Sequence, residues 1–496
     1  MTARKYFLGI DAGQTVVKAV IHDDKLARVS LARRLSPMSS NEPRRLERSQ
    51  DDLWKAASGA ITEAIQIAGI DPKEIACIGI TGHGDGLHLV DQNGRAVGPA
   101  IMAVDSRAFA EMEEIHQNEA RSSRILRASG QVPFLGSPGV LLKWTQCHEP
   151  QRLEDAHAFL FCKDVLRLRL TGEIATDYSD ASASFLNADL AKWDESVLAD
   201  YGLSGLEALF PRLISSSEIA GYVTAAAAAE TGLMVGTPVV GGVHDVHAAA
   251  IGMGALSENT LTLIAGSFTI NAVTTRESHT DARWQSRLSV VTDLRMAMST
   301  SATASTTLEW FLRLVGATDP ARRDQLFAEA ADIPPGESLP TVLPFFYASP
   351  FGESPSGTFA GMRGWHTPAH MLKAVLEGIV SMHVWHTSAL ADAFSWHRPV
   401  HLGGGMANSG VYSQMVADAL DSETVVVSND ETGAFGAAAL AGVGVGHFAS
   451  LRDVESLVNV SSTKLPTAAL RGYWDERRKS GEILTENLTP WWDAFR

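Results

Sequence analysis

A carboxylate and two imidazoles lie together near the middle of the chain, in the segment GGVHDVHAAA (residues 241–250). Asp245 follows His244 directly, and His247 comes two residues later. A carboxylate can orient a hydroxyl group and take its proton, and histidines three residues apart can share one face of a helix. The segment is therefore a candidate catalytic base or a candidate metal site. The third interpretation is structural, because Asp before VHAAAIG is a good helix N-cap.

Two glycine turns lie half a chain apart. GIDAGQTVVKAVI (9–21) and LIAGSFTINAVT (263–274) both read as strand, tight turn, strand. Placing Gly13 on Gly266 gives an offset of 253 residues, which indicates a duplicated domain. Asp11 precedes the first turn, whereas Ile264 holds the equivalent position in the second. Turn amides suit phosphate oxygens and a nearby carboxylate suits a cation, so we expect an asymmetric anion site between the two halves.

A third glycine element is VHLGGGMANSGVYSQ (400–414), which reads as a strand end, a turn and a helix from about Ser409. Glycines let the backbone approach a flat or anionic ligand closely. The element lacks the Gly-Lys-Ser/Thr ending of a P-loop. A last small-residue run, ETGAFGAAALAGVGVG (431–446), predicts a helix packed tightly against a neighbour.

Composition narrows the class of protein. A chain of 496 residues predicts two or three domains, and a net charge of −16 argues against a general nucleic-acid surface. The three cysteines are scattered and suggest neither zinc nor disulfides. We see no signal peptide and no uncharged run of about 18 residues, so we expect a cytoplasmic protein that does not enter a membrane.

Taken together, the motifs resemble those of the FGGY carbohydrate kinases, of the actin-like ATPase superfamily, over roughly residues 6 to 446. The three glycine elements resemble the two phosphate loops and the adenosine loop of that family. Four more segments resemble its other motifs: AVDSRA (103–108, without the usual Trp), LLKWTQCHEP (141–150), CKDVLRLRLTGEIATDYSDAS (162–182) and PFFYASPFGESPSGTFAGMRGWHTPAHMLKAVLEGIV (344–380).

The resemblance implies an α/β fold of two ribonuclease-H-like domains with a deep cleft between them. It implies a sugar-binding N-terminal domain (1–247), a nucleotide-binding C-terminal domain (248–496), and transfer of the γ-phosphoryl group of ATP to a hydroxyl group of a small sugar or polyol. ATP and Mg²⁺ are the expected cofactors, and a homodimer is compatible with the family. Because phosphoryl transfer needs a hard, oxygen-bound cation, and no third ligand joins the two histidines, the resemblance favours Asp245 as a base over a zinc site.

Residue roles carry over by position. Asp245 matches the catalytic base, and Asp11 and Asp245 are expected to hold Mg²⁺ through water. The residues expected at ATP and its phosphates are Asp11, Gly13, Gln14, Thr15, Lys18, Gly266, Ser267, Thr269, Gly404, Gly405 and Asn408. The residues expected at the sugar are His83, Asp85, Asp105 and His244.

Some of these positions keep an alternative. Lys18 could equally be exposed on its strand. Arg107 is the expected ion-pair partner of Asp105, and Asp85 could accept hydrogen bonds from two adjacent sugar hydroxyls. The adenosine loop departs from the family where the usual third glycine becomes Met406.

Loop variations narrow the substrate. GSFTIN (266–271) resembles the Gly-Thr-Trp-Ser-Ile-Asn form of this loop more than the Gly-Thr-Ser-Gly form of the D-xylulose kinases. TGHGDGL (81–87) and Glu309-Trp310 resemble the L-xylulose/3-keto-L-gulonate kinases and the erythritol kinases. We therefore expect an L-xylulose-type pentulose kinase, with an erythritol, other polyol or D-xylulose kinase as alternatives, and a non-catalytic sugar-binding regulator as the rival from another class. A neutral substrate is expected, because the loop offers no Arg or Lys and Asp85 would repel a sugar acid.

Overall fold

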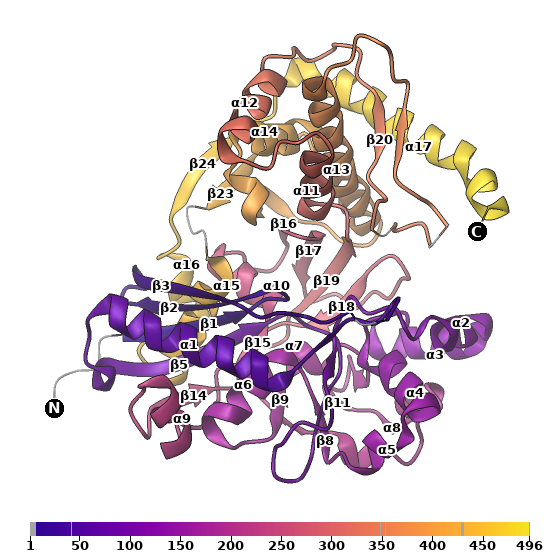
Figure 1. The fold of residues 1–496 in the computed structure, drawn as a ribbon. Helices are drawn as coiled ribbons and strands as arrows, with labels where there is room; N and C mark the ends of the chain where they lie inside the picture. The colour runs from indigo at the N-terminus through magenta and orange to yellow at the C-terminus, as the bar shows by residue number, and fades with distance from the viewer. Residues whose placement is uncertain (1–5, 41, 348, 353, 428–430, 496) are drawn as a thin grey trace. The chain divides into compact units, whose positions relative to one another are not determined.

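A computed structural model describes residues 6–40, 42–347, 349–352, 354–427 and 431–495 (Figure 1). The chain divides into two compact units that are not contiguous in sequence. The first unit comprises Met1–Leu256, Arg276–Met296 and Glu431–Val458, and the second comprises Ser257–Thr275, Ala297–Asp430 and Asn459–Arg496. The family-domain boundary expected after residue 247 stays a prediction, because these units are defined by contacts alone. None of the described helices is both long and apolar enough to cross a membrane.

The first unit is built on one mixed sheet, in the order β13-β14-β5-β1-β2-β3, with β15 also paired to β5. β1 pairs antiparallel with β2 and parallel with β5. The strands are β1 (Tyr6–Ala12), β2 (Val16–His22), β3 (Arg28–Leu35), β5 (Ile75–Gly82), β13 (Ile219–Tyr222), β14 (Pro238–Val240) and β15 (Val243–His244). The predicted strand-turn-strand over 9–21 is confirmed.

Alternation along β1 explains how this sheet is covered on both faces. Leu8 and Ile10 belong to the core formed with α1 (Gln50–Ala68), whereas Phe7 belongs to the core formed with α15 (Thr432–Gly444). A Cβ atom on Gly9 would come within 2.0 Å of the Ala434 carbonyl oxygen. The small residues of α15 therefore let this helix approach the strands closely, as the sequence predicted.

Further short elements surround this sheet. The helices are α2 (Phe109–Gln117), α3 (Glu119–Ser129), α4 (Pro138–His148), α5 (Pro150–Glu154), α6 (Cys162–Thr171), α7 (Tyr178–Ala181), α8 (Glu195–Asp200), α9 (Ala225–Thr231), α10 (Asp245–Gly252) and α16 (Leu451–Glu455). The strands are β4 (Glu47–Arg48), β6 (His88–Val90), β7 (Ala100–Ile101), β8 (Ala158–Leu160), β9 (Ala175–Asp177), β10 (Leu186–Asn187), β11 (Lys192–Trp193) and β12 (Arg212–Ile214).

The second unit repeats the strand arrangement of the first. β16 (Thr260–Ala265) pairs antiparallel with β17 (Thr269–Thr275) and parallel with β22 (His397–Gly403). These pairings match those of β1 with β2 and β5, so the duplication inferred from the 253-residue offset is present in the fold. The sheet has the order β18-β19-β17-β16-β22-β23-β24, and its remaining strands are β18 (Gln285–Leu288), β19 (Arg295–Ser301), β23 (Thr424–Val427) and β24 (Val460–Lys464). The helices are α11 (Ser305–Leu314), α12 (Pro320–Ala331), α13 (Pro368–Ala391), α14 (Gly410–Ala419) and α17 (Arg471–Ala494).

Both units combine a mixed sheet with helices, which confirms the predicted α/β class. The third glycine element also has its predicted form. β22 ends at Gly403, a short 3₁₀ turn covers Gly405–Asn408, and α14 begins at Gly410 with Ser409 as its N-cap. A hairpin of β20 (Thr341–Leu343) and β21 (Thr358–Ala360) completes the unit.

Candidate active site

Asp245 is the first residue of α10, directly after β15. The N-cap position belongs to His244, whose side chain makes no capping hydrogen bond. The interpretation of Asp245 as an N-cap is therefore wrong. The side chain of Asp245 keeps 42 % of its surface exposed, in contrast to 5 % for the side chain of His244. A carboxylate in this position can meet a ligand.

The carboxyl group of Asp245 has a raised pKa. Burial among protein groups raises its pKa to about 7, although part of the side chain stays accessible. The negative charge of Asp11 is the next cause, and that of Asp85 acts in the same direction. The backbone N–H of Val246 and the charge of Arg287 oppose the rise. A base whose pKa lies near the working pH is well matched to accepting a proton from a hydroxyl group.

Asp11 lies at the end of β1, on the face covered by α15. A Cβ atom on Gly433 would come within 2.9 Å of Asp11 Oδ2, so the carboxylate lies against the first turn of that helix. Burial raises the pKa of Asp11, Lys18 opposes the rise, and Glu431 adds to it. Helix N-termini favour negative charge, which suits a carboxylate or a phosphate here.

Lys18 is neither isolated nor fully exposed. Its Nζ lies 2.7 Å from Glu431 Oε2 and 3.6 Å from Asp11 Oδ2. The neighbouring turn of Gly13, Gln14 and Thr15 links β1 to β2, and Gly13 donates its N–H to the Val16 carbonyl. Lys18 therefore places a positive charge beside Asp11 and Glu431. It lies close to the turn that the sequence predicts to bind phosphate.

Asp85 follows β5 in a left-handed conformation, with φ of 58°. Arg287 of β18 donates from Nη2 to Asp85 Oδ1 at 2.9 Å and to Oδ2 at 3.2 Å. Burial raises the pKa of Asp85, and the charge of Arg287 works against that rise. The sequence argument for a neutral substrate assumed no cation beside Asp85, and this assumption is wrong. Arg287 comes from a strand 202 residues away in sequence.

The two histidines beside Asp245 are buried and neutral. His244 Nε2 lies 3.5 Å from Asp245 Oδ1, and His244 Nδ1 lies 3.4 Å from His247 Nδ1. Burial lowers the pKa of His244 well below its usual value and that of His247 to about 4. His244 therefore places an uncharged, polar ring beside the Asp245 carboxylate, and His247 contacts that ring.

His83 is held from both sides by protein groups. Its Nε2 lies 2.8 Å from Arg48 Nη2, and its Nδ1 lies 3.2 Å from the Gly84 carbonyl oxygen. Arg48 also donates from Nη1 to the carbonyl oxygens of Gly13 and Gln14, at 3.3 and 3.1 Å. Arg48 thus joins the first glycine turn to the loop after β5. The expected contact of His83 with sugar stays a prediction.

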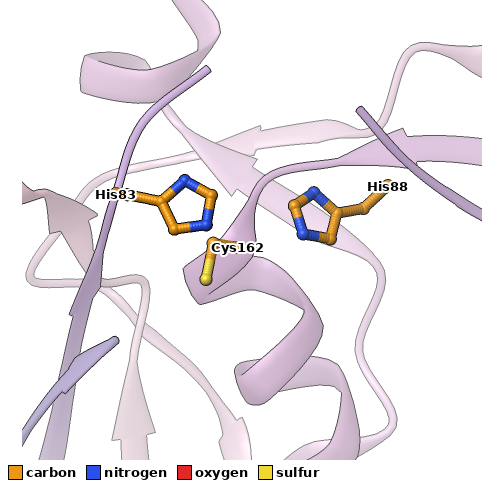
Figure 2. Close-up of side chains that lie close together, drawn as sticks. All are labelled: His83, His88 and Cys162. Atoms are coloured by element: carbon orange, nitrogen blue, oxygen red, sulfur yellow. The ribbon is translucent and has the colours of Figure 1, made fainter. Parts of the chain in front are cut away.

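Figure 2 shows His83 with His88 and Cys162, whose ligand-type atoms lie within 4.8 Å of one another. This spacing suits a metal ion, but the positive charge of the neighbouring Arg48 does not. Arg48 Nη2 lies 3.1 Å from Cys162 Sγ as well as against His83, so a cation already fills the cluster. Burial raises the pKa of the Cys162 thiol to about 11, which keeps it protonated. We interpret His83 and Cys162 as part of a buried hydrogen-bonded core around Arg48.

The side chain of Asp105 is hydrogen-bonded to nearby protein groups. Its carboxylate accepts hydrogen bonds from the backbone N–H of Leu46 and from Nε and Nη2 of Arg107. The predicted ion pair with Arg107 is confirmed, with a closest distance of 2.8 Å. With its side chain buried, Asp105 shapes the loop after β7, and its predicted role at the sugar remains a prediction.

The second unit contains a cavity of about 420 Å³ beside two of the glycine elements. This volume is within the range of small-molecule sites. Gly266, Ser267 and Gly405 line it, and their predicted contact with the nucleotide stays a prediction. Thr269 is turned into the core, where its Oγ1 lies 3.0 Å from Thr303 Oγ1. Gly404 and Asn408 flank the lining residues. The other lining residues are Ala265, Ser305, Leu308, Glu309, Arg323, Phe327, Leu376, Met406, Ser409 and Tyr412.

Three residues near the candidate site were absent from the sequence expectations. Arg287, Arg48 and Glu431 are ordinary charged residues in the sequence, far from the motifs that they contact. Pairing between distant segments brings them to Asp85, His83 and Lys18. Periodicity within one segment contains no signal for such contacts.

Comparisons with known proteins agree with this arrangement. The sequence pattern of the FGGY family of carbohydrate kinases matches twice, with its N-terminal domain over residues 6–252 and its C-terminal domain over residues 261–445. The L-xylulose/3-keto-L-gulonate kinase of Escherichia coli is 31 % identical, over 91 % of this chain and 90 % of that protein. A probable L-xylulose kinase of Pasteurella multocida is also 31 % identical, over 97 % of this chain and all of that protein.

Among solved structures, a xylulose kinase from Rhodospirillum rubrum superposes with a TM-score of 0.88 at 26 % identity. The match covers 99 % of this chain and all of that one. The predicted fold, with two halves of the actin-like ATPase type, is therefore confirmed.

Proposed function

The chain belongs to the FGGY family of carbohydrate kinases, and from that premise we propose that it transfers the γ-phosphoryl group of ATP to a hydroxyl group of L-xylulose. The observation that carries the proposal is Asp245, a partly exposed carboxylate with a pKa of about 7 at the start of α10. The names of the relatives from E. coli and P. multocida support the choice of sugar.

In this reaction Asp245 accepts a hydrogen bond from the sugar hydroxyl and takes its proton as the oxygen attacks the γ-phosphorus. The new bond joins the sugar oxygen to phosphorus, the bond from phosphorus to the bridging oxygen of ADP breaks, and ADP leaves with that electron pair. His244, neutral and 3.5 Å from Asp245 Oδ1, supports the carboxylate without adding charge that would weaken it as a base.

Asp11 and Asp245 fit Mg²⁺, which prefers hard oxygen ligands and keeps several of its waters. The fit rests on their charge, because Asp11 raises the pKa of Asp245 and a cation between them would relieve that repulsion. When bound, Mg²⁺ neutralises charge on the phosphate oxygens. Asp11, at the first turn of α15, would orient the water ligands, and Lys18 adds positive charge from β2.

For the nucleotide we propose the cavity of the second unit. Its glycine-lined edge, with Gly266, Ser267 and Gly405, lets phosphate oxygens approach the backbone closely. Its other walls include Phe327 and Tyr412, which suit a flat base.

A second candidate substrate class is favoured by one observation. Arg287 offsets the charge of Asp85, so a sugar carboxylate would meet a cation as well as an anion. The E. coli relative is named for 3-keto-L-gulonate as well as L-xylulose. A sugar acid of this type is therefore the alternative substrate, ahead of erythritol or D-xylulose.

The test is ADP release with L-xylulose, 3-keto-L-gulonate, D-xylulose and erythritol, with product identification by NMR. We expect the highest kcat/KM with L-xylulose. A higher value for another member of the panel would replace the substrate and leave the reaction class intact. Saturable sugar binding without ADP release would point instead to a sugar-binding regulator. A cytoplasmic location and a homodimer remain predictions, the latter for measurement by light scattering.

A further inference from the structure

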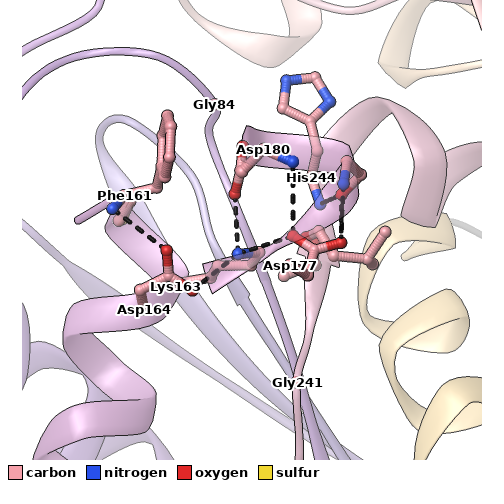
Figure 3. A network of polar contacts seen from close by, with 12 residues as sticks. Gly84, Phe161, Lys163, Asp164, Asp177, Asp180, Gly241 and His244 are labelled. Atoms are coloured by element: carbon pink, nitrogen blue, oxygen red, sulfur yellow. Dashed lines mark hydrogen bonds and ion pairs between the residues drawn. The ribbon is translucent and has the colours of Figure 1, made fainter. Parts of the chain in front are cut away.

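A buried ionic cluster lies beside the segment that leads to Asp245. Figure 3 shows Lys163 of α6 in contact with three carboxylates. Its Nζ lies 2.7 Å from Asp164 Oδ1, 2.9 Å from Asp177 Oδ1 and 3.0 Å from Asp180 Oδ2, and none of these four side chains is exposed. Arg167 adds a second cation, 2.8 Å from Asp164 Oδ1. Burying charges costs solvation energy, and the attraction between the charges often does no more than offset that cost. Stability alone is therefore a weak explanation for such a cluster.

The cluster is arranged so that Asp177 stays ionised. The charge of Lys163 and hydrogen bonds from two serine hydroxyls outweigh burial and lower the pKa of Asp177. Burial raises the pKa of Asp180 well above its usual value. Asp177 is therefore the strong acceptor of the cluster, and its Oδ2 lies on the side of Ser179 and β15.

Two contacts connect the cluster to the segment Gly241–Asp245. Arg167 donates from Nη1 to the Gly241 carbonyl oxygen at 2.6 Å, at the beginning of the segment. At its end, the His244 backbone N–H donates to Ser179 Oγ at 3.0 Å. Ser179 Oγ in turn donates to Asp177 Oδ2 at 2.6 Å. The residue that follows His244 is Asp245.

The order of donors in this chain is fixed by chemistry. A serine hydroxyl has one proton to donate and lone pairs to accept. The ionised Asp177 can only accept, so the Ser179 proton points toward it. The lone pairs of Ser179 are then left for the His244 N–H. This chain of Asp177, Ser179 and the His244 N–H holds the backbone from which the Asp245 carboxylate projects.

We infer that Ser179 is a positioning residue for Asp245, acting through the His244 backbone and held in its orientation by Asp177. The inference rests on the proposed role of Asp245 as the base. A base must be held within a fraction of an ångström of its working position, and a displacement of about 1 Å can lower the rate about 100-fold. Loss of one hydrogen bond from the His244 N–H allows a smaller displacement, and we expect a loss of about tenfold in kcat.

Ser216 provides a matched control. Its Oγ donates to the same oxygen, Asp177 Oδ2, at 2.7 Å, and it is buried like Ser179. Its hydroxyl makes no hydrogen bond to the segment from Gly241 to Asp245 among the described residues. Ser179→Ala and Ser216→Ala therefore remove equivalent bonds to the cluster, and only the first removes the acceptor for His244.

We expect Ser179→Ala to lower kcat about tenfold, with KM for sugar and for ATP changed less than about twofold. Ser216→Ala should keep kcat within about twofold, and the two variants should lose similar Tm. In an Asp245→Asn background, Ser179→Ala should cause no further loss of kcat, because the group that it positions is gone. If Ser179→Ala does not fold, Ser179→Cys, which keeps the volume and weakens both bonds, should lower kcat in the same way.

Equal kcat in the two alanine variants, a wild-type kcat in Ser179→Cys, or a full additional loss in the Asp245→Asn background would overturn the inference. Wild-type activity in Asp245→Asn alone would instead overturn the proposed base. The two failures are therefore distinguishable.

Discussion

The imidazole of His244 occupies the space where a side chain on residue 84 would lie. A Cβ atom on Gly84 would come within 2.1 Å of both Cδ2 and Nε2 of His244. The loop after β5 and the strand before Asp245 therefore fit together only because residue 84 has no side chain. This contact fixes His244, and with it the neighbouring carboxylate, against the loop that carries Asp85.

Gly84→Ala should destabilise the protein by roughly 1–3 kcal/mol, because a methyl group there overlaps a buried ring. The measurement is the free energy of unfolding by urea. In a His244→Ala background the same substitution should be much less destabilising, with a coupling of roughly 0.5–3 kcal/mol. Additive effects of the two substitutions would contradict the contact.

The rate should depend on the protonation of Asp245. Burial and the charge of Asp11 raise its pKa to about 7, so below that pH the group is protonated and cannot accept a proton. At low concentrations of both substrates, where the rate reports the free enzyme, kcat/KM should fall about tenfold for each pH unit below 7 and level off above it. A kcat/KM that does not change between pH 5.5 and 8 would show that the protonation of Asp245 does not control the rate.

Arg287→Gln should impair the sugar site and leave the nucleotide site intact. Arg287 Nη2 donates a hydrogen bond to Asp85 Oδ1 at 2.9 Å, and the substitution removes this charged partner of Asp85. Hydrogen bonds to charged groups contribute roughly 1.5–3 kcal/mol, so KM for sugar should rise about 10- to 100-fold. KM for ATP should stay within about twofold.

The matched control is Arg283→Gln, a partly exposed arginine four residues earlier that pairs with Asp281. It should leave both KM values near wild type. A rise in KM for ATP equal to that for sugar would mean that Arg287 acts on the fold as a whole.

Gly405→Ala should weaken ATP binding without unfolding the protein. A Cβ atom on Gly405 meets no heavy atom within 4 Å, yet this residue lines the cavity of about 420 Å³. The added methyl group therefore occupies ligand space, and KM for ATP should rise severalfold at constant Tm. Gly410→Ala, which also meets no atom within 4 Å and does not line the cavity, is the control. Equal KM values for ATP in the two variants would exclude this cavity as the nucleotide site.

Local patterns predicted the elements around the candidate site well. Glycine turns between extended runs identified β1–β2 and β16–β17, and the 253-residue offset identified their duplication. The run of small residues in 431–446 correctly predicted a tightly packed helix, because a strand can approach a helix closely only where side chains are small. Each of these features depends on residues that are close together in the sequence.

Contacts between distant segments could not be read in the same way. Arg287 reaches Asp85 from β18, where the Ser286 N–H donates to the carbonyl oxygen of Gly130 at the end of α3. The chain from Asp177 to His244 likewise joins segments about 65 residues apart. The N-cap interpretation of Asp245 was wrong by one residue. The extended strand continues through His244, which is therefore the N-cap.

The most direct test of the account is single-turnover phosphoryl transfer by Asp245→Asn, with ATP binding measured on the same preparation. We expect ATP affinity within about twofold of wild type and a rate of sugar phosphorylation lower by about 10²–10⁴-fold, the usual contribution of a general base. A wild-type rate of phosphorylation at pH 7.5 would contradict the assignment of Asp245 as the group that accepts the sugar proton.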